Sequence, residues 1–325
     1  MNPMRPLAAA ALTGLAALSG CSSIGGGMAA GGSSVEPLAG YECGQLQVLA
    51  GFDGERATLQ AGNRTLVLEQ VPAASGAKYQ SPNNAGTSFW TKGDLALLEV
   101  DGRAWPECVA LGGVPDTFSA GGNEPFWRVS LAQDQLTFDE PGKTSQVVPY
   151  QVQSRQPLGL TLTAELANGP VTLAVERQLC RDSMTGMPHP YQVELNRNGR
   201  TLAGCGGDPR QLLQGVEWVV ESIDGEGMVD DTRATINFLA DDRIAGRASC
   251  NRFMGGYEVT GEGLGISRLA STMMACQPEV LAQERRFMGS LEQVRSADFN
   301  ADGALVLTTT EGGTIRAYPS RSLSQ

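Results

Sequence analysis

The chemistry open to this chain of 325 residues depends on a small set of reactive side chains, which includes seven cysteines and one histidine. The histidine, His189, lies between two prolines, a setting typical of a rigid turn. A Ser-His-Asp triad or a histidine-rich metal site would need this one residue. Asp182 and Ser183 lie near it, but no nucleophile elbow surrounds them. We therefore expect a non-enzymatic protein with no catalytic residues and no cofactor.

The six cysteines that follow Cys21 are an even number, which in an exported chain is typical of disulfides. Several pairings are compatible with the sequence. Pairing of neighbours joins Cys43 to Cys108, Cys180 to Cys205 and Cys250 to Cys276, and each bond then lies within one stretch of similar composition. No CxxC or other metal-type spacing occurs, so neither a metal site nor thiol redox chemistry is predicted.

The first 21 residues have the pattern of an export signal. Arg5 supplies a positive charge and Leu7 to Leu18 form an apolar run, which is shorter than the roughly 20 residues needed to span a bilayer. The segment Leu18-Ser19-Gly20-Cys21 resembles a bacterial lipobox. The resemblance implies a signal peptide over residues 1–20 and lipid attachment at Cys21. Ser22 is typical of outer-membrane sorting, so we expect a lipid-anchored protein that faces the periplasm or the cell surface.

Composition divides the remaining chain into a tether and folded modules. Residues 21–40 contain Cys21 followed by a stretch rich in Gly, Ser and Ala, which is typical of a flexible tether. The cysteine pairs then suggest modules at 41–110, 111–210 and 211–319, with a tail at 320–325. With 41% hydrophobic and 18% charged residues, the modules can form packed cores.

The chain is acidic, with 35 Asp and Glu against 24 Lys and Arg, for a net charge of −11. Loss of Arg5 with the signal peptide would leave the mature chain one unit more negative. This balance argues against nucleic acid or anionic lipid as the main partner and favours a basic macromolecule.

The first module has short, often alternating segments separated by Gly, Asp, Asn or Pro, which predict a small antiparallel barrel or sandwich. The expected strands are 45–50, 57–60, 64–70, 88–91, 94–100 and 103–108. The polar sequence from Gln80 to Ser88 contains Pro and an Asn-Asn pair, so we expect a projecting loop there.

Several motifs of this module resemble the family of membrane-bound inhibitors of C-type lysozyme (MliC). They are Tyr41-Glu42-Cys43, Ser75-Gly76-Ala77-Lys78-Tyr79, Phe89-Trp90-Thr91-Lys92-Gly93 and the terminal Cys108. The resemblance implies an eight-stranded barrel that offers Ser75 and Lys92 to the lysozyme active-site cleft, with Gly76 and Tyr79 in the same binding motif. For Tyr79, as for the aromatic residues before Lys92, packing is the simpler role.

The implied inhibition has a direct physical basis. A C-type lysozyme works with one protonated carboxyl group and one carboxylate in a sugar-shaped cleft. An ammonium would pair with the carboxylate, and a hydroxyl can bond to the acid in either protonation state. Lysozymes of this type are strongly basic, and the first module from Glu36 to residue 110 carries nine acidic against five basic residues. Long-range attraction would therefore speed their association.

The middle module is predicted to be β-rich, with strands at 127–131, 136–139, 161–166 and 171–178. Its opening sequence, Gly122-Asn123-Glu124-Pro125-Phe126-Trp127, and its later cysteine segments resemble an uncharacterised module of bacterial envelope lipoproteins. The resemblance implies a location rather than an activity.

The third module combines predicted strands at 218–220, 234–239, 243–249 and 304–309 with a helix over 279–294. The helix is expected because Val280, Phe287, Leu291 and Val294 fall on one face. The sequences at 246–253, 256–257 and 271–276 resemble the META/HslJ domain, which implies a mixed, β-rich fold and no established reaction. We expect Asn251 and Thr272 to be turn or cap residues.

Together these observations predict a mainly β, multi-domain lipoprotein of the outer membrane whose first module binds and inhibits C-type lysozyme. The alternative is a general envelope-maintenance or stress-resistance lipoprotein that acts through its META/HslJ-like domain without potent lysozyme inhibition.

Overall fold

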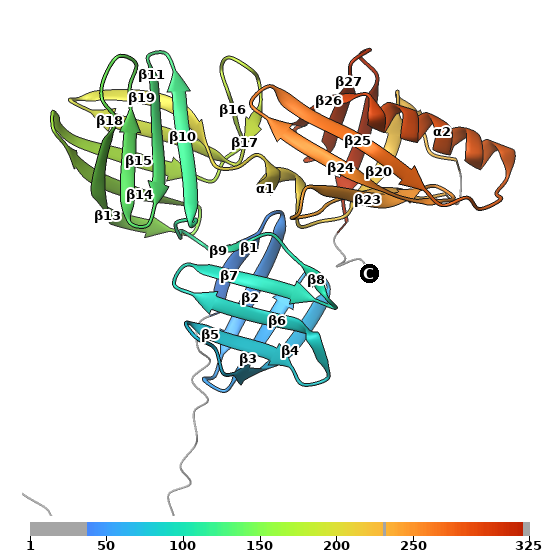
Figure 1. The fold of residues 1–325 in the computed structure, drawn as a ribbon, viewed down its shortest axis with the longest axis horizontal. Helices are drawn as coiled ribbons and strands as arrows, with labels where there is room; N and C mark the ends of the chain where they lie inside the picture. Colours follow the sequence, from blue (N-terminus) through green and yellow to red (C-terminus); the bar gives the residue numbers. More distant parts are fainter. Residues whose placement is uncertain (1–37, 230–231, 321–325) are drawn as a thin grey trace, which may run out of the picture. The chain divides into compact units, whose positions relative to one another are not determined.

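The computed structural model describes residues 38–229 and 232–320, which form a mainly β protein with two helices (Figure 1). The expected signal peptide, the lipid site at Cys21, the tether up to residue 37 and residues 321–325 of the tail lie outside the described residues. No helix within the described ranges has the length and apolar character that a membrane crossing requires. The strands form three large sheets, each around its own hydrophobic core, and one two-stranded hairpin.

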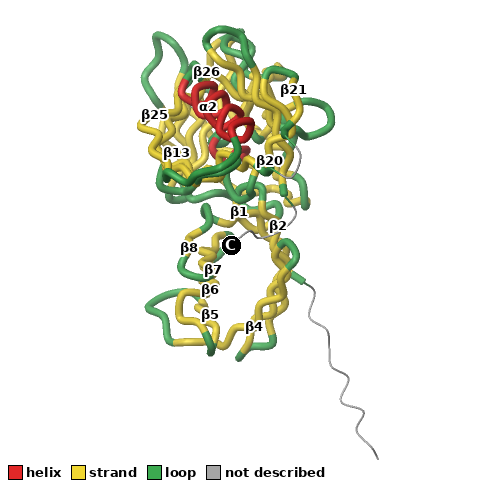
Figure 2. Tube along the Cα trace, turned by 90° about the vertical axis from the view of Figure 1, so that its right-hand side faces the viewer, coloured by secondary structure: helices red, strands yellow, loops and turns green. Residues whose placement is uncertain are grey.

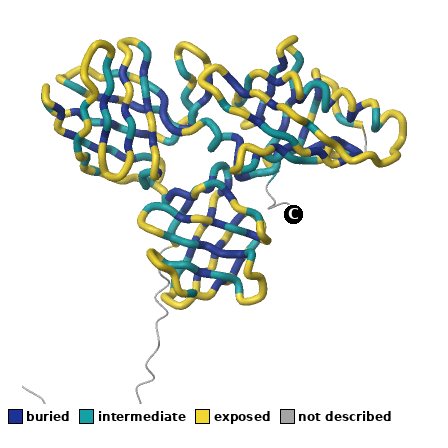
Figure 3. Tube along the Cα trace, viewed as in Figure 1, coloured by how far each residue is buried: buried dark blue, intermediate teal, exposed yellow. Residues whose placement is uncertain are grey.

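The first sheet closes on itself, because β6 pairs with β7 and β9 joins β7 to β1. Its core side chains come from alternate positions, as in β3, where every second residue is buried. Figure 3 shows this alternation of buried and exposed residues. The strands are β1 Ala39–Cys43, β2 Leu46–Phe52, β3 Arg56–Ala61, β4 Arg64–Val71, β5 Ala77–Ser81, β6 Asn84–Lys92, β7 Leu95–Val100, β8 Arg103–Ala104 and β9 Cys108–Ala110.

The second sheet is a closed barrel of eight antiparallel strands. They are β10 Thr117–Asn123, β11 Phe126–Ala132, β12 Gln135–Asp139, β13 Gln146–Gln156, β14 Gly159–Leu166, β15 Gly169–Glu176, β18 Tyr191–Arg197 and β19 Arg200–Gly206. A small hairpin of β16 (Cys180–Arg181) and β17 (Pro188–His189) lies in the connection between β15 and β18.

The third sheet follows the order β25-β24-β23-β22-β20-β28-β27-β26, and the helix α2 packs Phe287 and Leu291 into its core. Figure 2 shows this helix in red among the strands of its own domain. The elements are α1 Arg210–Leu213, β20 Trp218–Ile223, β21 Glu226–Gly227, β22 Ala234–Phe238, β23 Arg243–Ala248, β24 Arg252–Thr260, β25 Gly263–Ser271, α2 Pro278–Glu292, β26 Val294–Phe299, β27 Leu305–Thr309 and β28 Thr314–Pro319.

Three disulfides join Cys43 to Cys108, Cys180 to Cys205 and Cys250 to Cys276, the same neighbour pairs that were expected from the sequence. The first connects β1 to β9 and so fastens the closure of the first sheet. The mainly β, multi-domain fold class is confirmed, as is the helix that was expected from its apolar face.

The prediction of a projecting loop at 80–88 is wrong. β5 and β6 continue through it and meet at Pro82 and Asn83. The polar side chains are accommodated because Asp101 accepts a hydrogen bond from the Asn84 amide at 2.8 Å and donates its own backbone N–H to the Thr87 hydroxyl at 3.0 Å. The hydrogen bond from Arg64 to the Asp101 carboxylate is the main cause that lowers the pKa of that carboxyl. Polarity therefore marked a hydrogen-bonded hairpin here and not a free loop.

Candidate binding site

The structure brings the loop that carries Ser75 and Gly76 against the end of β6, where Thr91 and Lys92 lie. Ala77 is directly opposite Thr91 in the β5–β6 pairing. Gly76 has a φ of +66°, and a Cβ at this position would overlap the carbonyl oxygen of Thr91 and lie 3.3 Å from the Lys92 Cα. Only glycine fits this approach without strain, so the two sequence motifs meet at one edge of the barrel.

Trp90 holds the Ser75 loop in place. Its indole Nε1 donates a hydrogen bond to the Ser75 carbonyl oxygen at 2.8 Å, and the Lys78 ammonium lies 5.6 Å from the centre of its ring. Sequence reasoning gave Trp90 a packing role and missed this bond. The sequence did hold a signal that Trp90 lies near the binding edge, because Trp90 and Lys92 are two residues apart in a strand and their side chains therefore share a face.

The Lys92 side chain is exposed, and among the described residues it forms no ion pair or hydrogen bond. The nearest carboxylate in the sequence, Asp94, accepts a hydrogen bond from the Val114 amide at 3.1 Å. Ser75 is also exposed, and its fixed group is the backbone carbonyl rather than the hydroxyl. The edge thus presents an ammonium and a hydroxyl, which are the groups needed to bind a carboxylate and a carboxylic acid.

Tyr79 occupies a different environment from the other three predicted residues. It is only 5% exposed, and its ring lies 5.4 Å from that of Phe52 in the core. Phe89, directly opposite Tyr79 on β6, is fully buried. Ser75, Gly76 and Lys92 therefore share the barrel edge, whereas Tyr79 supports the same hairpin from inside.

The surroundings of His189 show the contacts of a structural residue. Its Nδ1 lies 3.0 Å from the carbonyl oxygen of Gly207. Asp182 accepts hydrogen bonds from the backbone of Met184 and Thr185 at 3.0 and 2.9 Å and from the Asn123 amide at 2.9 Å. Burial opposes ionisation of this carboxyl, but the hydrogen bonds outweigh it and lower its pKa. These contacts hold the Asp182 carboxylate within its own turn.

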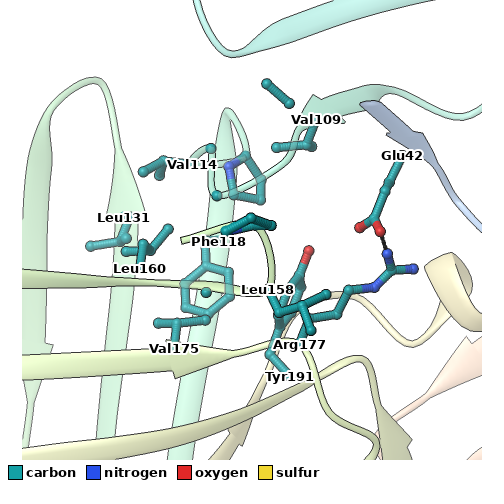
Figure 4. A pocket seen from close by; sticks show the side chains of 16 residues that line it. Glu42, Val109, Val114, Phe118, Leu131, Leu158, Leu160, Val175, Arg177 and Tyr191 are labelled. Carbon is teal, nitrogen blue, oxygen red and sulfur yellow. Dashed lines mark ion pairs between the residues drawn. The ribbon is translucent and has the colours of Figure 1, made fainter. Parts of the chain in front are cut away.

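An apolar pocket lies at one end of the middle barrel, and Figure 4 shows Phe118, Leu131, Leu160 and Val175 around it. Its free volume is about 30 Å³, enough for one or two water molecules. Tyr191 also lines it, and burial raises the pKa of that phenol. The pocket is too small for a ligand of metabolite size. Elsewhere in the described ranges, no cluster of three or more His, Cys, Asp or Glu side chains could hold a metal ion.

The predicted turn residues Asn251 and Thr272 belong to one polar network in the third domain, in which Asn251 and Glu284 are buried and Thr272 is exposed. The Glu284 carboxylate accepts hydrogen bonds from the backbone N–H and the side-chain amide of Asn251, both at 2.8 Å. The Asn251 side-chain oxygen in turn accepts hydrogen bonds from the Thr272 hydroxyl at 2.9 Å and the Met274 backbone N–H at 2.7 Å. Asn251 thus ties α2 to the segment that ends at Cys276.

Comparison with known families gives two matches along the chain. The model described as "Membrane-bound lysozyme-inhibitor of c-type lysozyme" matches residues 41–105. The model described as "META domain" matches residues 211–322. Both resemblances expected from the sequence motifs are therefore confirmed, in the expected order along the chain. The first family is one of inhibitors rather than enzymes.

Two solved structures are similar to about one third of the chain. One, described as the NMR structure of a protein from Burkholderia xenovorans, is 24% identical, covers 34% of this chain and 85% of its own, and has a TM-score of 0.29. Another NMR structure is 27% identical, covers 34% of this chain and 94% of its own, and also has a TM-score of 0.29. A search of the curated proteins found no match.

Proposed function

We propose that the first barrel binds C-type lysozyme and blocks its active-site cleft, with the Lys92 ammonium and the Ser75 hydroxyl as the groups that enter the cleft. The observation that carries this proposal is the meeting of the two motifs at one edge, where Gly76 packs against Thr91. Lys92 at this edge forms no ion pair with a described residue. The match to the inhibitor family over residues 41–105 supports it.

The electrostatics of such a complex are favourable at two distances. At long range, the acidic chain attracts a basic enzyme and increases the association rate. At contact, the Lys92 ammonium would exchange its hydrogen bonds to water for a hydrogen bond to a lysozyme carboxylate. A charge-assisted hydrogen bond of this kind is stronger than a neutral one. Lys92 does not first have to break an internal ion pair, so little of the gain is lost.

The inhibitor family is one of membrane-bound proteins, which supports a membrane location for this chain. We propose that lipid attached to Cys21 anchors the chain in the outer membrane and that the tether holds the barrel away from the headgroups. Replacement of Cys21 by Ser should then move the protein from the membrane to the soluble envelope fraction, as measured by fractionation.

Inhibition assays with the chain from residue 22 onward test the lysozyme proposal. We expect Lys92→Ala to weaken binding by about 2–5 kcal/mol and Ser75→Ala by about 1–2 kcal/mol. Lys143→Ala is a matched control, because Lys143 is exposed and pairs with Glu140 in the middle barrel. It should leave inhibition unchanged. Equal inhibition by the Lys92→Ala and Lys143→Ala variants would show that Lys92 is not the inserted group.

The alternative function rests on the META domain match over residues 211–322. If that domain carries the physiological role, the folded and oxidised protein will fail to inhibit lysozyme. Deletion of the gene will then weaken resistance to envelope stress without a change in lysozyme sensitivity. A change in lysozyme sensitivity would contradict the alternative.

A further inference from the structure

The outer face of the third sheet carries two arginines that lie directly opposite each other on neighbouring strands. In the pairing of β23 with β24, Arg247 faces Arg252, and in the pairing of β22 with β23, Thr235 faces Arg247. Directly opposed residues have Cβ atoms about 5 Å apart, so like charges in these positions repel each other. Both arginines are exposed.

No carboxylate of the described structure compensates this pair. Arg233, at the start of the neighbouring strand, is paired with Glu217 at 2.7 Å, and Arg243 is paired with Asp241. Neither Arg247 nor Arg252 forms an ion pair with any described residue. The chain has a net charge of −11, so acidic residues outnumber basic ones. Two adjacent arginines without an ion-pair partner are therefore not explained by an excess of basic residues.

The pair borders a hollow in the surface of the sheet that is open to solvent and measures about 490 Å³. Glu217, Arg233, Thr235, Asn237, Arg247 and Arg252 are among the residues that line it, and the Glu217 carboxylate is neutralised by Arg233 at 2.7 Å. The strands below are fixed, because the Arg247 backbone N–H donates to the Thr235 hydroxyl at 3.3 Å and the Arg252 N–H donates to that of Thr272 at 3.2 Å. The two side chains therefore extend from a fixed backbone, and their guanidinium groups can turn toward a common ligand.

We propose that Arg247 and Arg252 form a binding site for a phosphate group. Guanidinium groups bind phosphate through paired N–H donors, and two of them match the charge and the oxygen atoms of a tetrahedral dianion. A single carboxylate would neutralise only one of the two arginines. The site lies in a different sheet from Ser75 and Lys92.

Titration of the chain from residue 22 onward with inorganic phosphate tests the site. This chain contains all of the described residues, 38–229 and 232–320. Chloride at matched ionic strength is the reference. We expect phosphate to raise the melting temperature of the wild type and to bind about tenfold or more weakly to Arg247→Gln and to Arg252→Gln. Arg243→Gln is the matched control, since it removes the same charge from the same strand outside the hollow, and it should bind like the wild type.

A second set of measurements separates the sources of the phosphate. Vesicles of phosphatidylglycerol are compared with vesicles of phosphatidylcholine at the same salt concentration. Binding to the anionic vesicles that is lost in both arginine variants supports a lipid headgroup as the ligand. Binding of inorganic phosphate alone supports a soluble phosphate compound. The proposal is overturned if phosphate acts no differently from chloride, or if Arg243→Gln weakens binding as much as the two hollow variants.

Discussion

Two polar sites of this chain illustrate different uses of similar residue types. At the edge of the first barrel, Lys92 and Ser75 are exposed. The Ser75 loop is held there by the close approach of Gly76 to Thr91 and by the hydrogen bond from the Trp90 indole to the Ser75 carbonyl oxygen. In the third sheet, Asn251 is 3% exposed and Glu284 8%, and their polar groups bond to each other. The first site keeps its reactive groups available, whereas the second uses them to hold the fold. Hydrogen bonding within the fold is what distinguishes the two.

The largest effect that tests this comparison is expected in the buried network. Asn251→Ala removes one side-chain donor to Glu284 and the acceptor for Thr272 and Met274. Because it leaves a buried carboxylate short of a partner, we expect the free energy of unfolding to fall by about 2–4 kcal/mol. Urea unfolding measures this loss, and Thr272→Val, which removes a single donor, should cost only about 1 kcal/mol.

The same variant sharpens the comparison through its effect on binding. Below its unfolding transition, Asn251→Ala should inhibit lysozyme as well as the wild type does, because the network lies in another domain. A loss of inhibition in the folded variant would show that the two sites are not independent.

A smaller effect is expected at the loop edge, from substitution of its glycines. Gly76→Ala introduces a side chain at φ +66° and against the Thr91 carbonyl, so the Ser75 loop must move away from Lys92. We expect a loss of about 1–2 kcal/mol in stability from the backbone strain and a further loss of inhibition. Gly93→Ala is a matched control, since Gly93 has a φ of +60° but no atom near a Cβ. It should lose stability alone, and equal inhibition by the two variants would contradict the steric argument.

An effect that is absent at neutral pH and appears only at high pH again concerns the third domain. Tyr257 is 4% exposed, and its hydroxyl donates to the Leu239 carbonyl at 3.1 Å. Burial is the main cause that raises the pKa of Tyr257 to about 12. Since an unfolded tyrosine ionises near pH 10, its contribution to stability is complete below about pH 10 and is lost as the pH rises toward 12. Tyr257→Phe should flatten this part of the stability curve in unfolding measured against pH. An unchanged slope would contradict the assignment.

The sequence predicted those elements whose side chains repeat with a clear period. The strand at 64–70 and the helix near 279–294 were found because apolar residues fall on one face of each. β13 was missed, since its residues are half-exposed or exposed along its whole length and Pro149 interrupts it. β5 was missed as well, because its last two residues, Gln80 and Ser81, belong to the polar segment that was interpreted as a loop.

The candidate site was predicted only in part for a similar reason. The residue types at Ser75 and Lys92 follow from the motifs, but their meeting depends on the β5–β6 register and on the absence of a Cβ at Gly76. The Arg247–Arg252 pair gave no sequence signal, because a separation of five residues places two side chains together only when a tight turn joins their strands.

The closure of the first two sheets also limits backbone strand pairing between this protein and other chains. A strand at an open edge can pair with the backbone of a neighbour, which is a common route to aggregation and to strand exchange. In the two closed sheets every strand of the ring has neighbours on both sides, so the described barrels offer no such edge. The third sheet is not closed by strand pairing, but its two end strands lie beside each other, since a Cβ on Gly263 of β25 would overlap the Arg295 carbonyl oxygen of β26. Contact between the end strands therefore limits pairing with another chain there, where the first two sheets limit it by a closed ring.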